Sequence, residues 1–127
     1  QLSYNDYVKT IILKNDKTIS LIGDRKLSYV SSNETNYLAF GLATEEYHNE
    51  LYEELFHKYA TSKKIKDFDS QFFIATMGEV KQYPWMQYPN EVSLHTYVRN
   101  QIHHRADNGQ ASYYDLETSI ATMRKYL

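Results

Sequence analysis

Apolar residues along this chain recur mostly at spacings of three and four, which is the repeat of an amphipathic helix. The strongest example is residues 37–59, where one face of a 3.6-residue period is apolar or aromatic. We therefore predict one long helix over residues 37–59 that packs against the core by this face. The residues on the face are Leu38, Leu42, Tyr52, Leu55, Phe56 and Tyr59.

A second helix is predicted over about residues 91–104. It follows two candidate N-cap residues, Asn90 and Ser93, whose side chains can bond the free N–H groups of a first turn. Its apolar positions recur every four residues, so they should face the core. These positions are Leu94, Val98 and Ile102.

A terminal helix is predicted over about residues 113–126. Ser112 with Asp115 three residues later resembles a capping box, with Asp in the usual Glu position. Arg124 and Lys125 fall in the last turn, where cations complement the helix dipole. Its apolar stripe consists of Leu116, Ile120 and Met123.

Other segments are less regular. Residues 6–14 and 68–80 also carry helical apolar spacings, whereas residues 18–30 fit a strand or a helix, of which we favour the helix. Residues 31–36 form a polar break and residues 61–66 a basic loop. Residues 83–89 are predicted to be an aromatic connector, because their two prolines exclude a regular helix. A turn is predicted around Asn108-Gly109.

The composition favours an all-α fold, a compact antiparallel helical bundle. Only two prolines and four glycines occur among the 127 residues, too few for a turn-rich β fold. The length fits one domain over residues 1–127. Because the sequence starts at Gln1 without Met, this domain is either the whole protein or a piece of a longer one.

Charge and cysteine content limit the functional classes. The net charge of −2 argues against broad adhesion to nucleic acid but permits a small basic site. The absence of Cys excludes disulfides and thiolate metal sites and fits a reducing compartment. No apolar run approaches the ~20 residues of a membrane span, and no signal peptide is visible. We expect a cytoplasmic protein without membrane association.

The densest chemistry lies in residues 99–104, which hold Arg99, Asn100 and the pair His103-His104. Imidazole exchanges protons near neutral pH, and guanidinium presents a fork of donors that suits phosphate. On a helix, His95, Arg99 and His103 share one polar stripe, whereas Arg99 and His104 are about 140° apart. Arg99 and His104 can converge only if the helix frays or bends near His104, or if a second subunit supplies one of them.

These groups suit RNA cleavage through the 2′-hydroxyl without a metal or other cofactor. A neutral imidazole removes the hydroxyl proton, the oxygen attacks phosphorus, and a guanidinium neutralises the charge that builds on the phosphate. Asn100 could orient the imidazole or bond the phosphate. DNA lacks the attacking hydroxyl and should remain intact.

Arg99-Asn100, three residues and His104 match the Arg-polar-x3-His signature of HEPN domains, which are compact all-α units. The flanking residues 94–104 also look like the C-terminal region of some ATPases of bacterial phage-defence and abortive-infection systems. The resemblance implies a metal-independent endoribonuclease, usually a homodimer, in which Arg99 and His104 are catalytic and Asn100 supports them. It also implies a toxin or phage-defence role, with an antitoxin or ATPase as a further partner.

Remaining candidates are assigned more loosely. We expect His103 and His95 to be auxiliary residues, and Arg105, Lys63 and Lys64 to line a basic rim for RNA, although a solvated loop is the alternative for the lysines. His95 and His103 are ~12 Å apart along a helix and cannot share a metal.

Three alternatives stay open at this point. The His pair can simply complement the negative end of the helix dipole. The domain can also be a non-catalytic interaction module of a larger ATPase, or a nucleotide-binding module. His48 and His57 are expected at the surface or in a groove, without a role.

Overall fold

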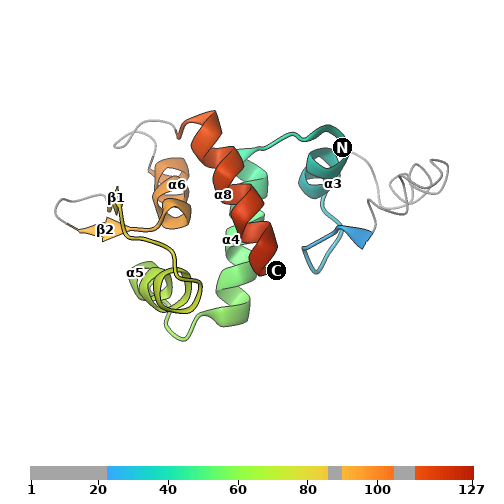
Figure 1. The fold of residues 1–127 in the computed structure, drawn as a ribbon. Coiled ribbons are helices and arrows are strands. Elements are labelled where there is room, and N and C mark those ends of the chain that lie inside the picture. The colour runs from blue at the N-terminus through green and yellow to red at the C-terminus, as the bar shows by residue number, and fades with distance from the viewer. Residues whose placement is uncertain (1–22, 86–89, 105–110) are drawn as a thin grey trace.

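The computed structural model describes residues 23–85, 90–104 and 111–127, and within these ranges the protein is mostly helical (Figure 1). The all-α prediction is confirmed at this level. Predictions for residues 6–14, residues 18–22, residues 86–89, Arg105 and the Asn108-Gly109 turn lie outside the described residues. The helix favoured over residues 18–30 is wrong for residues 24–30, whose backbone is a turn followed by bends and irregular structure. The elements are α3 (Ser32–Phe40), α4 (Glu45–Tyr59), α5 (Ile65–Phe68), the π-helix η1 (Asp69–Thr76), β1 (Tyr83–Pro84), β2 (Glu91–Val92), α6 (Leu94–His103) and α8 (Tyr113–Tyr126).

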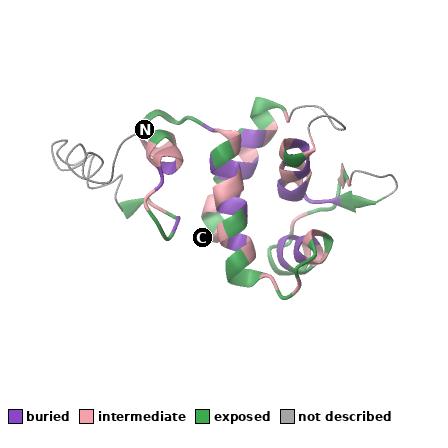
Figure 2. Ribbon diagram, turned by 180° about the vertical axis from the view of Figure 1, so that it is seen from behind, coloured by how far each residue is buried: buried purple, intermediate pink, exposed green. Residues whose placement is uncertain are grey.

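The core forms where α4, α6 and α8 pack against one another. Figure 1 shows α4 and α8 running in the same direction and α6 running against both. Hydrogen bonds cross these interfaces between His48 and Ser119 and between Tyr52 and Thr96. Buried positions recur along one side of α4 and exposed positions along the other, as expected of a helix with one face in the core (Figure 2). The buried apolar side chains of the three helices are Tyr47, Leu51, Tyr52, Leu55, Val98, Leu116, Ile120 and Met123.

The predicted continuous helix over residues 37–59 is wrong, because two helices share this region. Gly41 ends α3 in the left-handed backbone conformation at φ 66°, which residues with a Cβ atom rarely adopt. The Thr44 side chain then caps the first turn of α4. The polar break predicted at residues 31–36 is the start of α3, with Ser31 as its cap, and Leu42 lies 46% exposed in the link.

The segment before α6 also departs from the prediction. Helical backbone begins at Ile65 but changes to a π-helix at Asp69 and ends at Thr76, short of the predicted Val80. Residues 91–92, predicted as helix, pair as a strand with Tyr83–Pro84. No described helix is long and apolar enough to cross a bilayer.

The Ser112 cap and the apolar stripe predicted for the C-terminal helix are confirmed, but the capping box is only half formed, because no described hydrogen bond joins the Asp115 carboxylate to Ser112. The Ser112 hydroxyl accepts the Asp115 backbone N–H at 3.1 Å, so Ser112 caps α8 as its sequence indicated. Leu116, Ile120 and Met123 are buried, as is Val98 of α6. Leu94 and Ile102 of α6 are partly buried against the same core.

Candidate functional site

The start of α6 is fixed by a buried carboxylate from η1. Asp69 is fully buried, and its oxygens accept the backbone N–H and the hydroxyl of Ser93, the residue before α6. An acidic group at a helix N-terminus also complements the helix dipole. Asp69 therefore anchors the helix that carries the Arg99 motif, by which we mean residues 99–104.

Arg99 is half-buried on α6 and held by two neighbours. Its Nη1 donates to Asn100 Oδ1 at 3.0 Å. Its guanidinium carbon lies 6.0 Å from the centre of the Tyr52 ring on α4, within the range of a cation–π contact. The cation is thus positioned before any ligand arrives.

Asn100 connects Arg99 with His104. Its side-chain oxygen accepts from Arg99, and its main-chain oxygen accepts the His104 N–H at 2.8 Å. Asn100 is buried, and its Nδ2 makes no hydrogen bond within the described part of the chain. An unsatisfied buried donor costs about 1–3 kcal/mol, so Nδ2 is a group that gains from meeting an acceptor.

Helix α6 ends at His103, next to the residue where a bend or fraying would allow Arg99 and His104 to converge. His104 follows α6 with φ −127° and ψ 46°, outside helical geometry. The separation of about 140° that a regular helix imposes on Arg99 and His104 therefore no longer applies.

His103 is exposed in the last turn of α6. Partial burial lowers the pKa of its imidazole, the Arg99 and His104 charges lower it further, and Glu53 on α4 opposes them. His103 is therefore mostly neutral near pH 7 and able to accept a proton.

His95 lies at the other end of α6, and the prediction that it shares one polar stripe with Arg99 and His103 is wrong, because His95 is buried whereas His103 is exposed. It is 1% exposed, and its Nδ1 is 2.7 Å from the Ser119 hydroxyl of α8. The same hydroxyl is 2.7 Å from His48 Nε2. His95 faces the core because it falls three residues before buried Val98.

His48 is fully buried, so its predicted surface position is wrong. Burial lowers the pKa of His48 to about 3, and the nearby His95 and His103 add to the effect. The ring is thus neutral at physiological pH. His57, by contrast, is exposed at the end of α4 as predicted.

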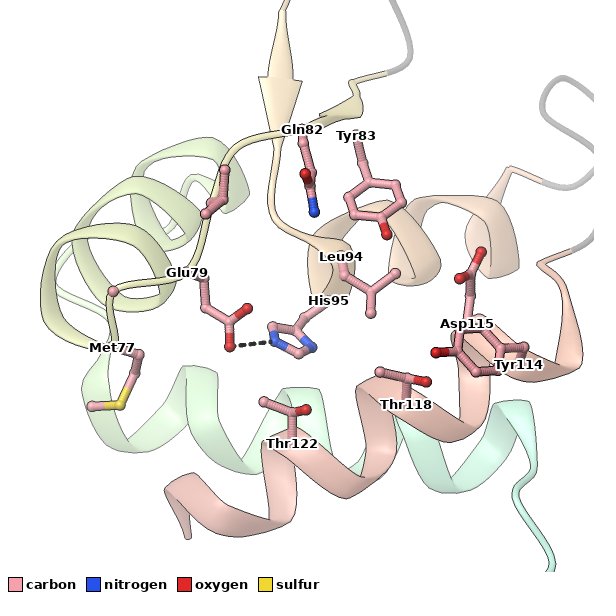
Figure 3. A pocket seen from close by; sticks show the side chains of 12 residues that line it. Met77, Glu79, Gln82, Tyr83, Leu94, His95, Tyr114, Asp115, Thr118 and Thr122 are labelled. Carbon is pink, nitrogen blue, oxygen red and sulfur yellow. Dashed lines mark ion pairs between the residues drawn. The ribbon is translucent and has the colours of Figure 1, made fainter.

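Beside His95 lies a pocket of about 440 Å³ (Figure 3). His95 Nε2 approaches Glu79 Oε2 to 3.1 Å, close enough for an ion pair but not aligned as a hydrogen bond. The Tyr126 hydroxyl donates to the same carboxylate oxygen. Glu79 reaches this position because the chain turns after η1, where its N–H bonds Phe73 O at 2.8 Å.

The predicted basic rim stays a prediction, because exposed lysines fit both a rim for RNA and a solvated loop. Lys63 and Lys64 are exposed between α4 and α5, and none of the described hydrogen bonds, ion pairs or ring contacts joins them to Arg99. Arg105 lies outside the described residues.

Sequence reasoning missed four residues of these sites. His48 had a usable signal, because it falls three, four and seven residues before Leu51, Tyr52 and Leu55 on the buried face of α4. Tyr52 was correctly predicted to lie in the core, but its contact with the Arg99 guanidinium was not predicted. The pairings of Glu79 and Ser119 with His95 are long-range, and no local spacing announces them.

Comparison with known proteins adds no assignment to this geometry: no protein-family model, curated protein or solved structure matches the chain.

Proposed function

We propose that this chain is a HEPN-like, metal-independent endoribonuclease whose site is built on Arg99, Asn100 and His104. The observation that carries the proposal is the position of Asn100 between the other two residues. One oxygen of Asn100 holds the guanidinium, the other holds the backbone of His104, and Nδ2 keeps an unused donor. The half-buried Arg99 guanidinium that Asn100 holds is a fork of donors that suits phosphate oxygens.

The reaction follows from these groups. The His104 imidazole takes the proton of a ribose 2′-hydroxyl, and the oxygen forms a bond to the adjacent phosphorus. The bond from phosphorus to the 5′-oxygen breaks, and the leaving oxygen takes a proton from water or from a second imidazole. The products are a 2′,3′-cyclic phosphate and a 5′-hydroxyl end.

Each residue has a distinct part in this scheme. Arg99 neutralises charge on the phosphate oxygens, and its contacts with Tyr52 and Asn100 reduce the reorganisation that this requires. His103 is the auxiliary imidazole, exposed and mostly neutral. Because His95 is buried against Ser119 and Glu79, we assign it no contact with RNA.

The active form that we propose is a homodimer. The pocket beside His95 does not include Arg99 or His104. Two copies related by a two-fold axis would place two Arg99 motifs face to face and create a cleft for RNA between them.

The test is cleavage of a fluorescent single-stranded RNA by the purified chain in EDTA. We expect cleavage that survives chelation, leaves cyclic phosphate ends and is lost with the 2′-deoxy substrate. Arg99→Ala should lower the rate by about 10²–10³-fold, the usual loss for one oxyanion donor. Arg99→Lys should recover only part of it, because ammonium lacks the guanidinium fork.

The control is Lys125→Ala, which removes an exposed cation from α8 and should leave cleavage unchanged. Gel filtration with light scattering reports the oligomeric state of every variant. An absence of cleavage by the unmodified chain, with a monomer in solution, would overturn the proposal and favour the interaction-module alternative.

A further inference from the structure

The pocket beside His95 is separate from the Arg99 motif and has its own chemical character. Its volume of about 440 Å³ lies within the usual range of small-molecule sites. Figure 3 shows polar tips from two sides aimed into it, with Gln82 and Tyr83 above and Thr118 and Thr122 of α8 below. Leu94 supplies an apolar wall between them.

The charge of the lining is negative. Glu79 and Asp115 both line the pocket, and none of the described lining residues is Lys or Arg. The interaction with His95 lowers the pKa of the Glu79 carboxyl, burial opposes it, and the Tyr126 hydroxyl lowers it further, so Glu79 is ionised at neutral pH. The Asp115 carboxylate has no hydrogen-bond or ion-pair partner within the described residues.

The two carboxylates lie at opposite ends of the pocket (Figure 3). Asp115 belongs to the first turn of α8, whereas Glu79 is bonded by Tyr126 in the last turn. Thr122, which lines the Glu79 end, is seven residues from Asp115, or about 10 Å along the helix axis. One metal ion cannot bridge that distance, but an extended dication can.

A buried polar group adds a second indication of a ligand. His95 is 1% exposed and lines the pocket, and its Nε2 has no aligned hydrogen bond despite its contact with Glu79. The Tyr83 ring stacks on Tyr97, and its hydroxyl points into the pocket above Leu94 (Figure 3). The Glu79 end of the pocket therefore contains a buried nitrogen without an aligned hydrogen bond, and the Asp115 end contains a carboxylate without a described partner.

From this arrangement we propose that the pocket binds a linear aliphatic polyamine, with one ammonium at Glu79 and another at Asp115. The methylene chain lies along Leu94, and the hydroxyls of Thr118 and Thr122 accept from the ammonium groups. This ligand pairs one ammonium with each of the two partly exposed carboxylates at once.

Isothermal titration of the full chain with spermidine tests the proposal, without RNA present. We expect saturable binding that butylamine reproduces only weakly and 1,8-octanediol does not reproduce. Asp115→Asn and Glu79→Gln should each weaken binding about tenfold or more, since each removes one charge-assisted contact. Asp115→Asn is decisive because Asp115 makes no described side-chain pair whose loss would disturb the fold.

Glu117→Gln is the matched control, because Glu117 is exposed on the same helix and makes the same change in net charge. It should bind spermidine within about twofold of the unmodified chain. Arg99→Ala should also bind normally, which separates this test from that of the ribonuclease. No binding at millimolar spermidine, equal binding of the diol, or equal losses in Asp115→Asn and Glu117→Gln would each overturn the proposal.

Discussion

The two ends of α6 place the same kind of side chain in opposite environments. At the start of the helix, His95 is buried between Ser119 and Glu79. At its end, His103 is exposed and His104 is partly exposed beyond the last helical turn. The first histidine is enclosed by the packed core, whereas the ring of His103 faces solvent near the half-buried Arg99. Imidazole content alone therefore does not identify a catalytic residue.

The largest expected effect is the loss of RNA cleavage when His104 is removed from the exposed end of α6. His104→Ala should reduce RNA cleavage by about 10²–10⁴-fold, the range of a general base, because it removes the imidazole that takes the proton of the 2′-hydroxyl. The melting temperature should change little, because the His104 backbone N–H bond to Asn100 survives the substitution. Cleavage assays and thermal denaturation of the same preparation measure both quantities.

His57→Ala is the control for this variant, since it removes another exposed imidazole from the end of α4. It should leave the cleavage rate unchanged. Full activity of His104→Ala would exclude His104 as the base and shift the role to His103.

At the buried end the expected effect is on stability. Ser119→Ala leaves His48 Nε2 and His95 Nδ1 without the hydroxyl that joins them. Each unpaired buried group costs about 1–3 kcal/mol, so the free energy of unfolding should fall by about 2–4 kcal/mol. Urea denaturation measures this, and Ser28→Ala, at an exposed position, should change stability by less than about 0.5 kcal/mol. A neutral Ser119→Ala would show that the two rings find other partners.

The buried end should also make the fold sensitive to acid. The unfolded chain protonates His48 as the pH falls through about 6.5, whereas the folded chain does so only near pH 3. Stability is therefore lost between these values, at up to about 1.4 kcal/mol per pH unit from this group. Urea midpoints from pH 7 to pH 4 should fall less steeply in His48→Gln. Parallel curves for the two proteins would rule out this contribution.

Local patterns predicted the parts of the fold that depend on a single helix. The Ser112 cap, the apolar stripe of α8 and buried Val98 follow from spacing and capping alone. The prediction of a continuous helix over residues 37–59 was wrong because Gly41, at φ 66°, ends the first helix although the apolar spacing continues on both sides of it. Periodicity does not detect a single left-handed residue.

The candidate site divides in the same way. Residues 99–104 could be proposed as a site from the sequence because their chemistry lies in one short segment. The contact of Arg99 with Tyr52 and the contact of His95 with Glu79 join separate elements. Their positions depend on how α4, η1 and α6 pack, which no local spacing encodes.

The smallest expected effect concerns the exposed end. Glu53 on α4 raises the pKa of His103, against the lowering by burial, Arg99 and His104. Glu53→Gln should therefore lower the pKa of His103, by a small amount because water screens an exposed pair. Titration of the ring protons by NMR measures this shift, and Glu46→Gln, at an exposed position near the other end of α4, should leave it unchanged. If His103 also takes part in proton transfer, the acidic limb of the cleavage profile moves to lower pH with it, because the neutral ring then persists to lower pH. A shifted His103 titration with an unmoved cleavage profile would restrict proton transfer to His104.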